Sequence, residues 1–176
     1  MNINHKLTCE ERLSAALKNT AGPIPRRDDL IKILSAALQA ADPQAAVIKN
    51  LCMIGNDFYA GAFIFQLVQN ARIETVALGK AAPAMLTGTI QQLGNFYDQG
   101  LCVCKHFVPT DHQNPGTRYI IGNHPVPGAG SLQAGEALKN FISGLCQDDF
   151  VLLLVSGGGS ALITLPATGV TLEEMQ

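Results

Sequence analysis

The sequence predicts an α/β domain in which helices cover both faces of a mostly parallel sheet. Two observations support this prediction. Short apolar runs alternate along the chain with longer stretches that carry apolar residues at helical spacing. The apolar runs also lack the polar–apolar alternation of a half-exposed strand, so they are typical of strands that are buried on both faces.

The first 26 residues are expected to form an N-terminal extension and a linker. A short helical pattern occupies part of residues 1–20, and the glycine and two prolines within residues 21–25 interrupt it. We therefore assign residues 1–26 to the extension and linker and residues 27–176 to the domain.

Helices and strands are expected to alternate along this domain. Helix predictions rest on apolar residues spaced three and four apart, and strand predictions rest on short apolar runs. Ser131, which follows two glycines, is expected to be the N-cap of its helix. The expected helices are 30–41, 44–51, 82–96 and 131–145, and the expected strands are 75–78, 101–108, 119–121 and 150–155.

The composition indicates a folded chain without a preference for charged partners. Of the 176 residues, 47% are hydrophobic and 15% are charged, and 14 acidic against 12 basic side chains leave a net charge of −2. This profile is typical of a globular protein, and the lack of a basic block disfavours nucleic-acid binding. No apolar run approaches the roughly 20 residues that span a bilayer, so no membrane partner is expected either.

Five scattered cysteines match no zinc-binding spacing, and no metal site is predicted from them. Cys102 and Cys104 lie in an apolar run, where they most simply act as small core residues. The N-terminus shows no secretion signal pattern. A reduced, cytoplasmic location is therefore expected.

The glycine-rich run after the last expected strand is the strongest candidate for a ligand site. Glycine permits positive φ and a close approach of the backbone, so several N–H groups can converge on one anion. A helix that begins at Ser160 would add its N-terminal N–H groups and the positive end of its dipole. The alternative is a tight turn that only joins a strand to a helix. The residues expected to bind the anion are Ser156, Gly157, Gly158, Gly159 and Ser160.

Gly79 and Lys80 follow the first expected strand at its carboxyl end. Ligands of open α/β sheets collect outside the carboxyl ends of the strands, so Lys80 is suited to bind a phosphate or a carboxylate. The segment is not a Walker loop, because Glu74 stands where the first glycine belongs and Ala81 stands where Ser or Thr would hold magnesium. The alternative is a solvated lysine at a strand end.

Asn123 and His124 lie in a loop after the third expected strand. Pro125 restricts His124 to extended geometry, which would fix an imidazole and an amide near the strand ends. His124 is a candidate base or hydrogen-bond donor for a polar substrate. A structural histidine that caps backbone groups is the alternative.

Two common catalytic motifs are missing. Leu162 stands where a dinucleotide fingerprint needs its last glycine, and neither Ser156 nor Ser160 lies in a Gly-x-Ser-x-Gly sequence. Hydride transfer with a nicotinamide cofactor and hydrolysis through an activated serine are therefore not expected.

Three ordered segments resemble the N-terminal half of the glycerate 2-kinase family, the MOFRL-type glycerate kinases. They are 76–85 (VALGKAAPAM), 122–127 (GNHPVP) and 156–162 (SGGGSAL), and the resemblance extends over residues 28–176. It implies a Rossmann-like three-layer α/β/α domain, to which family members add a second, C-terminal domain.

The resemblance implies ATP-dependent phosphorylation of D-glycerate with Mg²⁺, with 2-phosphoglycerate as the favoured product. Lys80 would bind the carboxylate or the transferring phosphoryl group, and the loop 156–160 would cradle phosphate. Since family members continue further, we expect a domain truncated at its C-terminus, with a missing C-terminal half or a second copy as its partner. The alternative function is a catalytically inactive anion-binding or phosphate-binding module.

Overall fold

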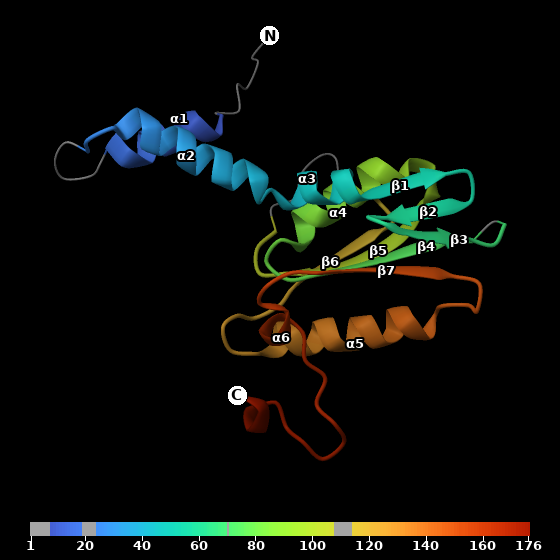
Figure 1. Cartoon of the computed structure of the whole chain (residues 1–176). Coiled ribbons are helices and arrows are strands. Elements are labelled where there is room, and N and C mark those ends of the chain that lie inside the picture. Colours follow the sequence, from blue (N-terminus) through green and yellow to red (C-terminus); the bar gives the residue numbers. More distant parts are fainter. Residues whose placement is uncertain (1–7, 19–23, 70, 108–113) are drawn as a thin grey trace, which may run out of the picture. The chain divides into compact units, whose positions relative to one another are not determined.

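The computed structural model describes residues 8–18, 24–69, 71–107 and 114–176 (Figure 1). The chain divides into two compact units, 1–42 and 43–176. Residues 21–23 of the expected linker and residue 108 of an expected strand lie outside the described part, and the expected division after residue 26 stays a prediction. None of the described helices has the length and apolar character that crossing a membrane requires.

The first unit is a pair of packed helices, α1 (Cys9–Lys18) and α2 (Arg27–Ala40). Thr8 and Glu11 cap α1 reciprocally. The Thr8 N–H donates to Glu11 Oε2 at 2.7 Å, and the Glu11 N–H donates to Thr8 Oγ1 at 3.2 Å. Helix α2 confirms the amphipathic helix expected over 30–41 and buries Ile31 and Ser35.

The second unit begins with α3 (Pro43–Asn50) and a small antiparallel sheet that the sequence analysis did not predict. Tight turns at Gly55 and Gly61, each with φ of 61°, join its strands. Strands of four residues are too short to show a periodicity, so the pattern of apolar residues missed them. In spatial order the strands are β1 (Leu51–Ile54), β2 (Asp57–Ala60) and β3 (Phe63–Gln66).

The main sheet of this unit has four strands, and every neighbouring pair is parallel. This confirms the predicted α/β fold with a parallel sheet. The spatial order is β6-β5-β4-β7. The strands are β4 (Ile73–Leu78), β5 (Tyr97–Cys104), β6 (Thr117–Ile121) and β7 (Phe150–Val155).

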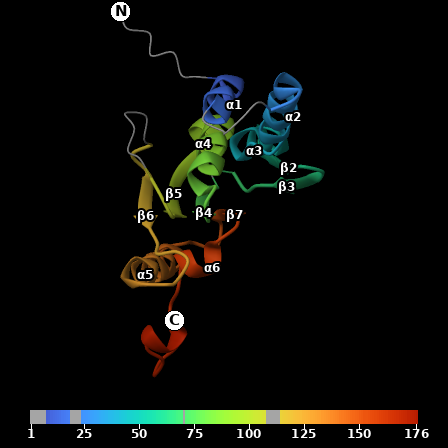
Figure 2. The same ribbon diagram turned by 90° about the vertical axis from the view of Figure 1, so that its left-hand side faces the viewer.

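Helices lie on both faces of the main sheet and give three layers. Figures 1 and 2 show α3 and α4 (Ala82–Leu93) on one face and α5 (Ala129–Ser143) and α6 (Gly159–Leu162) on the other. Each interface has its own apolar core. Cys102 and Cys104 are fully buried in the core beneath α4, which confirms that they act as small core residues.

Several elements differ from the prediction by a few residues, and two of these differences have a clear local reason. The helix expected over 82–96 ends at Leu93, because Gly94 has a positive φ and starts the short 3-10 helix η1 (Gly94–Phe96). The strand expected over 101–108 is Tyr97–Cys104 instead, since Tyr97 already pairs with Ile73. A second short 3-10 helix, η2 (Glu173–Met175), lies near the C-terminus.

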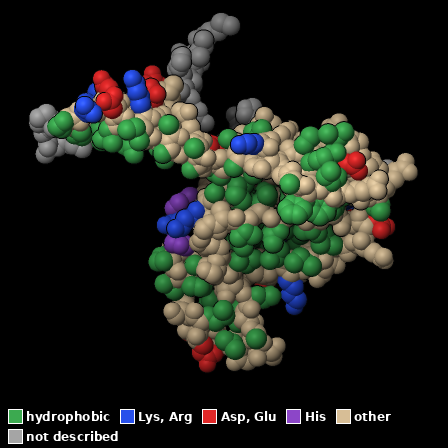
Figure 3. Space-filling view, viewed as in Figure 1, with side chains coloured by type: hydrophobic (Ala, Val, Ile, Leu, Met, Phe, Trp, Pro, Cys, Tyr) green, Lys and Arg blue, Asp and Glu red, His purple; other side chains and the backbone are tan. Residues whose placement is uncertain are grey.

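One side of β7 is not covered by a helix, so the predicted cover on both faces is incomplete there. Val151, Leu153 and Val155 are 41%, 58% and 61% exposed, whereas Leu152 and Leu154 pack against the core beneath α4. Hydrophobic side chains gather on the visible face of this unit (Figure 3).

Candidate anion-binding site

The connections of the main sheet create a switch point between β4 and β7. From β4 the chain passes through α4 to β5 and then reaches β6, whereas the connection from β6 through α5 returns to the other side of β4. The helix that follows β4 (α4) and the helix that follows β7 (α6) lie on opposite faces, so the chain leaves these two neighbouring strands toward opposite sides of the sheet. In open α/β sheets such a point, at the carboxyl ends of the strands, is where ligands bind.

Three loops at the carboxyl ends of the strands meet at Gly158. It has φ of 88°, and a Cβ at this position would lie 3.1 Å from Lys80 Cε and 3.3 Å from His124 Nε2. The loops after β4, β6 and β7 therefore meet at one place. Only glycine combines this backbone conformation with so close an approach. Figure 3 shows basic and histidine side chains gathered at this end of the unit.

The glycine loop itself offers hydrogen-bond donors. The Lys80 N–H donates to the carbonyl of Gly157 at 3.0 Å, which fixes the loop against the end of β4. In the described part of the chain, the N–H groups of Gly157 and Gly158 donate to no hydrogen-bond acceptor. Two backbone donors next to a lysine can hold oxyanion oxygens. Ser160 is exposed beside them.

The helix expected to begin at Ser160 begins one residue earlier and is short. Helix α6 starts at Gly159, where a Cβ would lie 3.3 Å from Leu78, and it ends at Leu162. A helix of four residues aligns too few peptide dipoles to produce a substantial macrodipole. The predicted contribution of a helix dipole at this loop is therefore not supported.

Gly79 and Ser156 are packed against each other beneath the loop. Ser156 Oγ accepts the Ala81 N–H at 3.1 Å and donates to the Leu78 carbonyl at 3.3 Å. Gly79 has φ of 118°, and a Cβ there would overlap Ser156. This clamp joins the ends of β4 and β7, so the hydroxyl of Ser156 already has partners within the protein.

Asn123 and the buried Ser131 fix the loop that carries His124. Asn123 Oδ1 accepts the Gly130 N–H at 2.9 Å. Ser131 Oγ accepts the N–H groups of Asn123 at 3.0 Å and Gly128 at 3.3 Å, and it donates to the Ala161 carbonyl at 2.7 Å. The expectation that Ser131 is the N-cap is wrong, because α5 begins at Ala129 and Gly128 takes that position. Ser131 instead links α5 to the loops after β6 and β7.

His124 has a depressed basicity in this setting. Burial lowers its pKa from the ordinary value, and the positive charges of Lys80 and Lys105 lower it further. The lowered pKa favours the neutral imidazole, which can both accept and donate a hydrogen bond. Its Nδ1 is buried and has no hydrogen-bond partner among the described residues.

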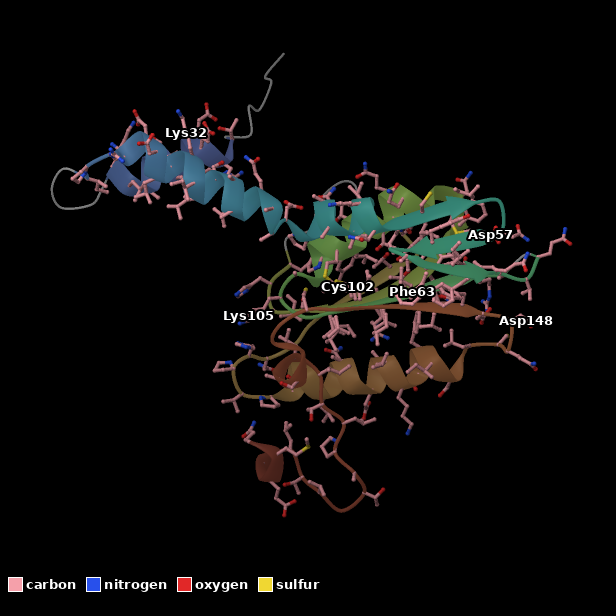
Figure 4. The ribbon with its side chains drawn as sticks, viewed as in Figure 1. Lys32, Asp57, Phe63, Cys102, Lys105 and Asp148 are labelled. Atoms are coloured by element: carbon pink, nitrogen blue, oxygen red, sulfur yellow. The ribbon has the colours of Figure 1, made fainter. Side chains whose placement is uncertain are left out.

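Lys105 is the residue of this site that the sequence analysis missed. The expected strand over 101–108 placed it inside a strand, whereas β5 ends at Cys104 and Lys105 is the first residue beyond. It therefore lies at the same edge of the sheet as Lys80. Had the predicted strand ended at Cys104, Lys105 would have been placed at a strand end and identified as a candidate site residue. Figure 4 labels Lys105 at this end and Asp148 at the opposite end of the unit.

A separate charged cluster occupies the amino end of the sheet. Arg72 binds Asp149 through two hydrogen bonds of 2.9 and 2.5 Å, and it lies 3.7 Å from Glu74 and 4.0 Å from Asp98. Arg72 lowers the pKa of Asp149, whereas burial raises the pKa of Glu74. These contacts link the starts of β4, β5 and β7, so this cluster supports the fold at the end away from the candidate site.

The described residues include no group of three or more His, Cys, Asp or Glu side chains that could hold a metal ion. Magnesium prefers oxygen ligands, above all carboxylates. The side chains of Lys80, Lys105 and His124 do not fit that requirement.

The structure is an α/β domain with a candidate anion-binding site, lined by basic side chains, at the switch point of a parallel sheet. The chain belongs to the family described as domain of unknown function DUF4147, whose model matches residues 29–176. The resemblance to glycerate kinases expected from the sequence is confirmed by relatives that bear this name.

Three comparisons show the extent of the similarity. A D-glycerate 2-kinase of Thermotoga maritima is 32% identical over 146 residues, which cover 83% of this chain and 31% of the relative. The crystal structure of a Pyrococcus horikoshii protein matches with a TM-score of 0.72 at 26% identity, over 87% of this chain and 34% of that one. The crystal structure of a Thermotoga maritima glycerate kinase matches with a TM-score of 0.61 at 29% identity, over 81% and 31%. The chain thus spans about a third of the length of these proteins.

Proposed function

We propose that this chain takes part in the ATP-dependent phosphorylation of D-glycerate, with 2-phosphoglycerate as the favoured product. The observation that best supports the proposal is the meeting of Lys80, His124 and Gly158 at the switch point of the sheet. The relative named D-glycerate 2-kinase is similar to this chain over 146 residues. ATP is the proposed phosphoryl donor.

The proposed roles follow from the chemistry of phosphoryl transfer. The reaction depends on aligning the donor and the acceptor and on neutralising the charge of the transferring group. Lys80 binds the carboxylate of the substrate or the transferring phosphoryl group. The N–H groups of Gly157 and Gly158 bind phosphate oxygens. His124, which is neutral, accepts the proton of the substrate hydroxyl as its oxygen bonds to the γ-phosphorus and the bond to ADP breaks.

Magnesium enters this proposal together with ATP. The side chains of the site do not form a magnesium site, so we derive no step of the reaction through the ion. A reduced, cytoplasmic location is part of the same proposal.

An assay of ADP release tests the function. The 176-residue chain is incubated with D-glycerate, ATP and Mg²⁺, and phosphorus NMR identifies the phosphorylated position. We expect turnover that the Lys80→Ala variant loses and that the Lys139→Ala variant, altered at an exposed lysine late in α5, retains. Absent turnover, with ATP or glycerate still raising the melting temperature, would limit the chain to binding and would contradict catalysis.

A further inference from the structure

We propose that Lys105 is a second anion-binding residue of this site and that Lys80 and Lys105 together select a small ligand group with two negative charges. The chemical class is a dianionic oxyanion. The proposal rests on the proposed function for the identity of that group in the reaction, which is a phosphoryl group. It adds a residue and a charge requirement to that site.

Lys80 and Lys105 each follow the carboxyl end of a strand, and these two strands, β4 and β5, are neighbours in the sheet. Strand β5 lies between β4 and β6, and Leu78 is level with Val103 while Cys104 is level with Ile121. Two hydrogen bonds of 3.0 Å continue the pairing just beyond the strand ends. The Gly79 N–H donates to the Val103 carbonyl, and the Gly122 N–H donates to the Cys104 carbonyl. Adjacent strands lie about 4.8 Å apart, so the long side chains of Lys80 and Lys105 can reach the same ligand beyond the strand ends.

Both lysines lack a counter-charge. Neither Lys80 nor Lys105 forms an ion pair in the part of the chain that the structure describes, in contrast to Arg72. The charges of both ammonium groups lower the pKa of the His124 imidazole. Two unpaired positive charges around one neutral ring raise the free energy of the empty site, and a bound anion lowers it.

The number of charges determines which anion is favoured. A monoanion neutralises one ammonium group and leaves the other unbalanced, whereas a dianion balances both. A tetrahedral oxyanion also has enough oxygens to accept from the lysines and from the free N–H groups of Gly157 and Gly158 at once. The site is therefore matched in charge and in donors to a phosphoryl-type group.

Binding of sulfate to the 176-residue chain tests the proposal. Sulfate is compared with nitrate at equal ionic strength, with isothermal titration for affinity and with NMR of the His124 ring for location. We expect sulfate to bind, nitrate to bind much more weakly, and Lys105→Gln to weaken sulfate binding roughly tenfold through loss of one charge-assisted contact. Lys105→Arg should retain most of the affinity, and Lys139→Gln should equal the wild type.

Two results would overturn the proposal. One is an unchanged sulfate affinity in Lys105→Gln, and the other is equal affinity for nitrate and sulfate. If Lys105→Gln fails to fold, Lys105→Arg and a Lys105→Met variant give the same comparison. A failed ADP-release assay with intact sulfate binding would contradict the kinase function alone, so the two failures are distinguishable.

Discussion

Gly79 and Ser156 are packed so closely that a Cβ on Gly79 would overlap both the hydroxyl and the carbonyl of Ser156. The same serine hydroxyl accepts the Ala81 N–H and donates to the Leu78 carbonyl. Two segments separated by more than seventy residues are thereby fixed at the switch point of the sheet. The position of Lys80 relative to the glycine loop depends on this contact.

Replacing Gly79 with alanine should destabilise the second unit strongly. The left-handed backbone and the overlap with Ser156 together should cost roughly 2–4 kcal/mol. Chemical denaturation measures the free energy of unfolding. The matched control is Gly55→Ala, which also has a positive φ but has no atom within 4 Å of the new Cβ. It should cost only about 1–2 kcal/mol, and equal losses for the two variants would contradict the packing argument.

Ser131→Ala should lower stability and also weaken anion binding. Its hydroxyl joins the N–H groups of Asn123 and Gly128 to the carbonyl of Ala161, and removing it leaves these partly buried groups without that partner. The expected loss is about 1–3 kcal/mol. Weaker sulfate binding would follow because the loop of His124 loses its anchor. Ser143→Ala, at an exposed position of the same helix, should change unfolding by at most about 0.5 kcal/mol.

The pKa of His124 should lie below the ordinary histidine value, and Lys80→Gln should raise it. Burial and the two lysines both oppose protonation. Since the folded-state pKa is depressed, stability falls as the pH drops through the unfolded and then the folded pKa. NMR titration of the ring measures the value, and bound sulfate should raise it. A pKa at or above the ordinary value in the free chain would show that the lysines do not act on this ring.

Glu74 and Asp149 should have opposite effects on the pH dependence of stability. The folded-state pKa of Glu74 is raised by burial, so its contribution is fully present below the unfolded pKa and is lost as the pH rises through the folded pKa. The wild type should therefore gain stability relative to Glu74→Gln as the solution is acidified. For Asp149, whose pKa Arg72 lowers, the wild type should lose stability relative to Asp149→Asn over the same change. Denaturation midpoints at several pH values give both slopes, and slopes of the same sign would contradict this account.

Much of the fold could be predicted because long elements carry their own pattern. The apolar run at 150–155 became β7 with the predicted bounds, and the helix expected over 30–41 formed as α2. The four-residue strands β1, β2 and β3 could not be found, because so few residues show no periodicity and their pairing depends on turns at Gly55 and Gly61.

The sequence by itself determined the family, the parallel α/β sheet and the position of Lys80 and the glycine loop at strand ends. Only the tertiary structure decided which of these residues face the open side of the site. It paired Gly79 with Ser156, used Asn123 at the start of α5, and brought Lys105 to the same edge as Lys80. The physical reason is that a strand end specifies where a side chain leaves the sheet, whereas the neighbouring strands and loops determine which hydrogen bonds and charges it meets there.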